Sequence, residues 1–314
     1  MLSRIADSLF WLNRYMERAE SLLRIVKTNY TLSLDKRLEN EIPLWKYTLE
    51  LFAPGNNSQI TLFEDDMESA LYKLMLDTEN TNSLRVIITK ARENARGVQD
   101  NITKEVWEHV NQLYHLINYP TVADNLTEFN TFQTIETLTR HILLYVGVTD
   151  NTMPRGLGWS FMNLGRYIER CLLTIEMTDK QYGMICYDLK DQRDIIYWKH
   201  LLLSMSGFEL HLKNYRSVNY NQNVLHQVLF NHDFIRSVIY SMAHIQNYLN
   251  DITGENNRPE NNSLIKSLNR VYSKVSYADF ETLNNTSLPL YLSDLKSGML
   301  DFSKRLEQIF FSYS

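Results

Sequence analysis

Glycine and proline are scarce in this sequence, which has 10 Gly and 6 Pro among 314 residues. A β-sandwich or barrel of this length needs many tight turns, and turns draw heavily on these two residues. Apolar residues make up 44% of the chain, so it can bury a substantial core. The composition therefore predicts an all-α fold, long enough for one large domain or two ordinary ones.

Cysteine is also rare, and the two present, Cys171 and Cys186, match no metal-binding pattern. Cys171 lies on an apolar helix seam, so we expect a buried thiol rather than a disulfide framework. Glu105 and His109 lie one helical turn apart, but no second Glu/His pair with that spacing completes a di-metal site of the kind found in helix bundles. The sequence thus predicts no metal and no other cofactor.

The sequence also lacks a strong excess of charge of one sign, and it lacks long apolar runs. The net charge is -5, and acidic and basic residues are interspersed, which argues against a nucleic-acid partner. Charged residues between Arg4 and Arg18 interrupt the first apolar stretch, so it does not resemble a signal peptide. No apolar run is long enough to cross a bilayer. We expect a cytoplasmic protein without a membrane partner.

The clearest positive signal is an apolar seam near the start of the chain. Its members recur at alternating spacings of three and four residues, which is typical of a helix packed against other helices: Leu2, Ile5, Leu9, Leu12, Met16, Ala19, Leu23 and Val26. The seam predicts a helix from residue 2 to about 33. Similar patterns predict helices at 43–52, 62–76, 84–98, 102–117, 131–146, 157–175, 192–205, 207–213, 224–229, 234–251, 264–275 and 288–311. The stretches 147–158 and 250–262 have the composition of loops.

Three landmarks indicate an internal duplication. Arg14 in the first helix recurs as Arg166, a shift of 152 residues. Two further pairs follow in the same order, at shifts of 153 and 154: Trp45 with Trp198, and Ser83 with Ser237. The sequence therefore predicts two tandem helical halves, 1–152 and 153–314. We expect about six helices in each half, packed together as one pseudo-symmetric unit.

A charged cluster accompanies each copy of the opening helix. Its members lie three and four residues apart and so share a helix face: Arg14, Glu17 and Arg18 in the first copy, and Arg166, Glu169 and Arg170 in the second. Three interpretations stay open, namely a solvated helix face, a structural ion-pair network and a ligand site. Aromatic neighbours such as Trp11 and Tyr15 favour partial burial, and a buried Glu needs a partner such as Arg.

A second cluster, Arg92, Glu93 and Arg96, distinguishes the two halves. At a shift of 154 its counterparts are neutral amides: Gln246, Asn247 and Asn250. The fold therefore does not require these charges, and this face is the asymmetric candidate for function. Guanidinium groups suit a carboxylate or a phosphate, although a solvated surface is the simpler explanation of the cluster.

The stretch 149–159 combines a loop with a helix start. Backbone N–H groups at such a start can hold an anion, and Arg155 could assist. Its glycines match neither a phosphate-binding loop nor a dinucleotide fingerprint. A linker between two halves explains the stretch as well.

Several motifs together resemble the Alpha-E family. They are RYMERA at 14–19, RYIER at 166–170, ARENAR at 91–96, and DNTMPR at 150–155 ahead of Gly158-Trp159. The family is described as a predicted helical domain with a recurrent Glu-Arg motif, and the resemblance covers essentially the whole chain. It implies an association with circularly permuted ATP-grasp proteins and transglutaminase-like peptidases, and hence a role in making or modifying a peptide or amide.

Three functional hypotheses follow, and no recognisable catalytic signature favours an enzyme. The first is a non-catalytic helical partner or scaffold of an ATP-grasp-type peptide or amide ligase and a transglutaminase-like peptidase, holding a peptide or amino-acid ligand. The alternative is a catalytic or ligand-binding domain whose Glu/Arg clusters bind a carboxylate-bearing substrate in a cleft between the halves. A structural homo-oligomer is the third, because the 19 tyrosines could serve interfaces.

Overall fold

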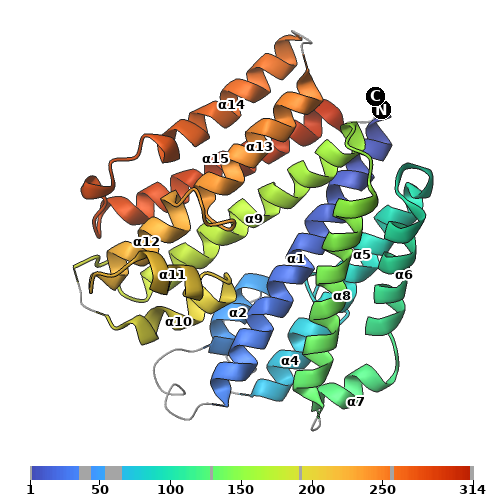
Figure 1. The fold of residues 1–314 in the computed structure, drawn as a ribbon, viewed down its shortest axis with the longest axis horizontal. Helices are drawn as coiled ribbons and strands as arrows, with labels where there is room; N and C mark the ends of the chain where they lie inside the picture. The colour runs from blue at the N-terminus through green and yellow to red at the C-terminus, as the bar shows by residue number, and fades with distance from the viewer. Residues whose placement is uncertain are drawn as a thin grey trace. The chain divides into compact units, whose positions relative to one another are not determined.

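The computed structural model shows an all-α fold, as the composition predicts (Figure 1). It describes residues 2–34, 44–53, 66–127, 130–190, 193–254 and 258–311. Across these ranges the chain forms 14 α-helices and no strand, and 80% of it is helical. The helices group into two compact units.

The first unit comprises Trp11–Pro154. It contains most of the long opening helix and six further α-helices. Their bounds are α1 Ser3–Ser33, α2 Leu44–Phe52, α4 Met67–Met75, α5 Leu84–Gly97, α6 Lys104–Ile117, α7 Thr121–Thr127 and α8 Thr131–Thr152. Helix α6 packs between α5 and α8, while α4 lies against α2, α5 and α7. The predicted Pro43 helix start lies outside the described residues.

The second unit comprises Arg155–Ser314 together with Met1–Phe10, a segment that includes the first part of α1. Its helices are α9 Leu157–Gly183, α10 Ile195–Ser204, α11 Phe208–Asn214, α12 Tyr220–Phe230, α13 Val238–Thr253, α14 Pro259–Ser276 and α15 Ser287–Phe310. Helix α9 packs against α13 and α15, and α14 packs against both of these helices.

The two units share an order of helix packing, although their boundaries are not those of the predicted repeats. The series α5, α6, α8 of the first unit matches α13, α14, α15 of the second. The capping serines also match: Ser83 Oγ accepts from the Val86 N–H, and Ser237 Oγ accepts from the Tyr240 N–H. The first part of α1, however, belongs to the second unit. The duplication itself stays a prediction.

The start of α1 packs closely on α9 within the second unit. A Cβ added at Gly165 would lie 2.3 Å from the carbonyl oxygen of Phe10, so only glycine allows this backbone approach. The Phe10 ring lies 5.1 Å from that of Phe311, and Phe311 lies 6.0 Å from Phe161. The beginning of α1 and the end of α15 therefore lie side by side (Figure 1).

Two predicted loops are largely helical. Helix α8 continues to Thr152, and α9 begins at Leu157, so the expected loop 147–158 shrinks to a short connection. The helix continues because Tyr145 and Thr149, on either side of Gly147, are both buried on the inward face of α8. No neighbouring atom lies within 4 Å of a Cβ placed at Gly147, so this glycine is not required by close packing. Similarly, α13 and α14 extend into the stretch 250–262. The prediction missed helix α7 because its sequence is mostly polar, and two of its described side chains are buried, Val122 and Leu126.

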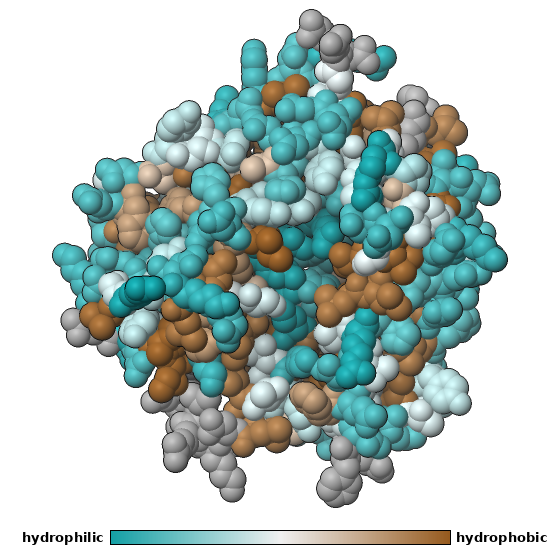
Figure 2. Space-filling view, in the orientation of Figure 1, coloured by the Kyte–Doolittle hydropathy of each residue, from teal (hydrophilic) through white to brown (hydrophobic). Residues whose placement is uncertain are grey.

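The molecular surface is mainly polar on the face shown in Figure 2. Apolar residues form separate patches there rather than one continuous band. Within the described residues, none of the helices combines the length and the hydropathy needed to cross a membrane.

Candidate functional site

The Glu-Arg motif of the first unit is mostly buried. Arg14 is 7% exposed and Glu17 is 4% exposed, while Arg18 is half-buried. The Arg14 guanidinium lies 4.6 Å from the centre of the Trp11 ring. Arg18 Nη1 donates a hydrogen bond to Asn82 Oδ1 at 2.9 Å. This bond ties α1 to the turn just before the capping serine of α5.

The motif of the second unit is also mostly buried, but here the last arginine is buried and the first is half-buried. Glu169 is 6% exposed and Arg170 is 5% exposed, while Arg166 is half-buried. Arg170 Nη1 donates to the Ile235 carbonyl at 3.3 Å, and its guanidinium lies 5.2 Å from the Tyr167 ring centre. Burial raises the pKa of Tyr167 to about 12, although Arg170 opposes the shift.

The last arginine of each motif thus has an equivalent partner. Arg18 and Arg170 both reach the turn ahead of a capping serine, Ser83 in one unit and Ser237 in the other. None of the six motif residues is without an interaction partner. The burial is incompatible with a solvated face for the two glutamates, because a carboxylate is not left buried without partners. A structural network or a ligand site remains the prediction for this motif.

The second predicted cluster contains one arginine that packs between helices, Arg92, and two exposed residues, Glu93 and Arg96. Arg92 Nε donates to Asn111 Oδ1 at 2.8 Å, and its guanidinium lies 4.4 Å from the Tyr114 ring centre. Its counterpart Gln246 makes the same kind of bond, donating from Nε2 to Asn269 Oδ1 at 2.8 Å. Packing between two helices therefore accounts for Arg92.

Glu93 and Arg96 differ from Arg92 because both are exposed on α5. Within the described part of the chain, neither side chain has a hydrogen bond or an ion pair. They are the two members of the cluster that a partner protein can reach.

Arg155 is exposed and stacks on a neighbouring ring. Its guanidinium carbon lies 3.7 Å from the centre of the Trp159 ring. Gly156, the N-cap of α9, offers no side-chain cap to the helix. The anion contact predicted for Arg155 has no independent support in this arrangement and stays a prediction.

The remaining polar candidates have structural surroundings. His109 is buried, with its Nε2 2.6 Å from the His141 carbonyl, and the two imidazole rings stack. Burial, helped by His109, lowers the pKa of His141. Among the residues that the structure describes, no group of three or more His, Cys, Asp or Glu side chains could hold a metal ion. Cys171 is a buried free thiol, as predicted, and Cys186 is an exposed one.

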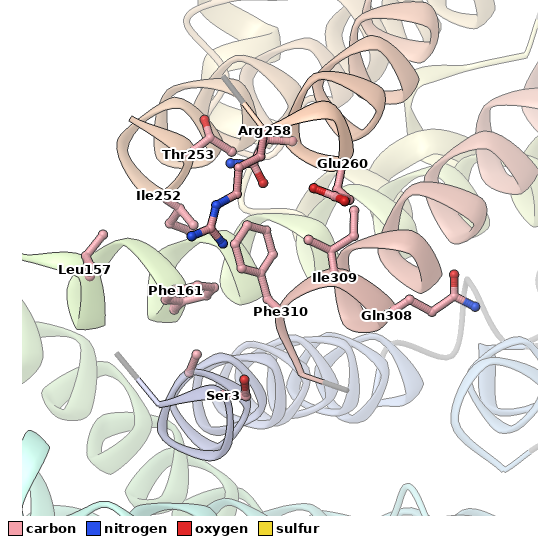
Figure 3. A pocket seen from close by; sticks show the side chains of 12 residues that line it. Ser3, Leu157, Phe161, Ile252, Thr253, Arg258, Glu260, Gln308, Ile309 and Phe310 are labelled. Atoms are coloured by element: carbon pink, nitrogen blue, oxygen red, sulfur yellow. The ribbon is translucent and has the colours of Figure 1, made fainter. Parts of the chain in front are cut away.

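A cleft of about 680 Å³ lies within the second unit and was missed by the sequence reasoning. It is lined by residues from five separate stretches: Ser3, Ala6, Leu157, Phe161, Ile252, Thr253, Arg258, Glu260, Asn261, Gln308, Ile309 and Phe310. Figure 3 shows Arg258 on the side of Ile252 and Phe161, whereas Glu260 lies on the side of Ile309. None of the six Glu-Arg motif residues lines it.

Comparisons with known proteins agree with the helical fold and the motif. A family model described as "Alpha-E: A predicted alpha-helical domain with a conserved ER motif" matches residues 1–311. The uncharacterised protein Mb2597 of Mycobacterium bovis is 22% identical over 315 residues, which cover 94% of this chain and 35% of that protein. The uncharacterised protein Rv2567 of Mycobacterium tuberculosis is 21% identical, and the alignment again covers 94% of this chain and 35% of that protein.

The chain thus spans about a third of the length of the curated relatives it matches. No solved structure matches it significantly. Because the family model covers nearly every residue, including both Glu-Arg segments, the chain belongs to the Alpha-E family.

Proposed function

We propose that this chain is a non-catalytic helical partner of an ATP-grasp-type peptide or amide ligase. The observation that carries the proposal is the burial of the Glu-Arg motif in both units, at Glu17 and at Glu169. Arg18 and Arg170 use their guanidinium groups to hold helix-capping turns. A motif used in this way stabilises a scaffold, which leaves the exposed surface to contact a partner.

The relatives support a role beside another protein part. In Mb2597 the matching region makes up 35% of the protein, so it is covalently joined to a longer stretch of other sequence. When relatives carry the helical region as one part of a longer protein, that region can act together with a second domain or protein. The ligase and the transglutaminase-like peptidase implied by the family resemblance are the partners to test.

The exposed pair Glu93 and Arg96 is the surface we assign to the partner. Both side chains project from α5 and have no polar partner within the described residues. Their counterparts in the second unit are Asn247 and Asn250, which are also exposed but carry no charge. The chain therefore offers a matched control for any charge effect.

The test is affinity capture of the tagged chain from its native host, followed by mass spectrometry. We expect an ATP-grasp-type ligase or a transglutaminase-like peptidase, and excess untagged chain should displace it. The double variant Glu93→Lys/Arg96→Glu should weaken capture, whereas Asn247→Lys/Asn250→Glu should leave it unchanged. Recovery of neither protein would contradict the proposal, and equal capture by both variants would exclude this face.

A further inference from the structure

Arg258 is the feature of the second unit with the least evident structural role. It is the N-cap residue of α14, yet its side chain makes no cap hydrogen bond. The side chain lines the cleft and is exposed, and no described residue pairs with it. A guanidinium that lines a cavity and has no partner among the described residues is available to a ligand.

Part of the wall around this guanidinium is apolar. Phe161 and Phe310 pack edge to face with their ring centres 5.6 Å apart, and Ile252 and Ile309 flank them in the lining (Figure 3). Phe161 is 4% exposed and Phe310 is half-buried, so it is mainly Phe310 that offers apolar ring surface to a ligand. The volume of about 680 Å³ lies in the range of small-molecule sites.

The charges restrict the class of ligand. A guanidinium fork matches a carboxylate, which can accept two parallel hydrogen bonds from it. Glu260, the second charged residue of the lining, would repel a multiply charged anion such as a phosphate. One cation, one anion and an apolar part of the wall therefore favour a singly charged carboxylate with an apolar body.

We propose that this cleft binds an α-carboxylate that carries a large apolar side chain, with Arg258 holding the carboxylate and the Phe161–Phe310 pair contacting the side chain. Such a group is present on a free apolar amino acid and at the C-terminus of a peptide. The ligand class rests on the proposed function, since a ligase partner would handle peptides or amino acids. The site rests on the cleft alone.

Glu260 separates the two sources of this carboxylate. A free amino acid has an ammonium group next to its carboxylate, and this group can pair with Glu260. A peptide terminus has a neutral amide at the same position. The variant Glu260→Gln should therefore weaken binding of a free amino acid but should not weaken binding of a peptide terminus, whose carboxylate loses only a repulsive neighbour.

The test is an NMR titration of the full chain with N-acetyl-L-phenylalanine, its uncharged amide and free L-phenylalanine. We expect the acid to bind about tenfold more tightly than the amide, as expected for one partly exposed charge-assisted contact. Arg258→Gln should remove that difference without weakening amide binding. Arg270→Gln, at an exposed arginine on the same helix away from the cleft, should change nothing.

Three results would overturn the assignment: equal affinity for acid and amide, unchanged acid binding in Arg258→Gln, or no shift at cleft residues with any of the three probes. Arg258 is exposed, so its variant should remain folded, and circular dichroism checks this directly. These titrations contain no ligase, so they can fail while partner capture succeeds, and the reverse also holds.

Discussion

Replacement of Gly165 by alanine should destabilise the second unit. The new Cβ would lie 2.3 Å from the Phe10 carbonyl oxygen and 3.1 Å from its carbonyl carbon, well inside van der Waals contact. Both atoms belong to the helix backbone, so α1 and α9 must separate to relieve the clash. Overpacking of this kind typically costs about 1–3 kcal/mol, and a backbone contact places Gly165→Ala at the upper end, about 3 kcal/mol.

Thermal and urea unfolding followed by circular dichroism would measure this loss. For a unit of this size, about 3 kcal/mol corresponds to a fall in Tm of roughly 6–12 °C. Gly147→Ala is the matched control, because it also lies in a helix but has no atom within 4 Å of an added Cβ. It should gain about 0.5–1 kcal/mol from helix propensity. A Gly165→Ala protein as stable as wild type would refute the close approach of α1 to α9.

Three further predictions concern burial and capping. Burial lowers the pKa of His200 to about 4. As the pH falls from 6.5 to 4, His200 therefore becomes protonated in the unfolded chain but stays neutral in the folded chain, which lowers the free energy of unfolding. Urea unfolding should show wild type losing about 3 kcal/mol more than His200→Gln between pH 7 and pH 4, and equal losses would contradict this. A thiol reagent should label Cys186 and spare Cys171 in the native protein, because Cys171 is buried and burial raises its pKa; two equally fast labels would show otherwise. Ser83→Ala and Ser237→Ala should each lower the free energy of unfolding by about 1 kcal/mol. If neither variant is less stable than wild type, the two serines do not stabilise their helices as N-caps.

Features with a local cause were predictable from the sequence. The α1 seam shows directly in the spacing of its apolar residues. Ser83 directly precedes the apolar pattern of α5, which is the position at which a serine caps a helix. The bounds of α8 were not predictable in the same way, because Gly147 signals a loop locally while buried Tyr145 and Thr149 hold the helix through tertiary packing.

The site shows the same division. The burial of Glu17 and Glu169 could only be anticipated as one of three options, because spacing fixes a position on a helix but not what packs against it. Arg92 suggested function by its charge, but its bond to Asn111 depends on how α5 and α6 pack. The cleft around Arg258 left no sequence signal, since five separate stretches of chain assemble it.

The central claim, that the Glu-Arg motif is a structural element, is tested most directly by Glu169→Gln. Removing the charge of a buried, partnered carboxylate should cost about 3 kcal/mol of unfolding free energy. The exposed control Glu281→Gln should stay within about 0.5 kcal/mol of wild type. The account predicts that Glu169→Gln is less stable but still captures the partner under conditions where it remains folded. A variant as stable as wild type that loses partner capture would contradict it.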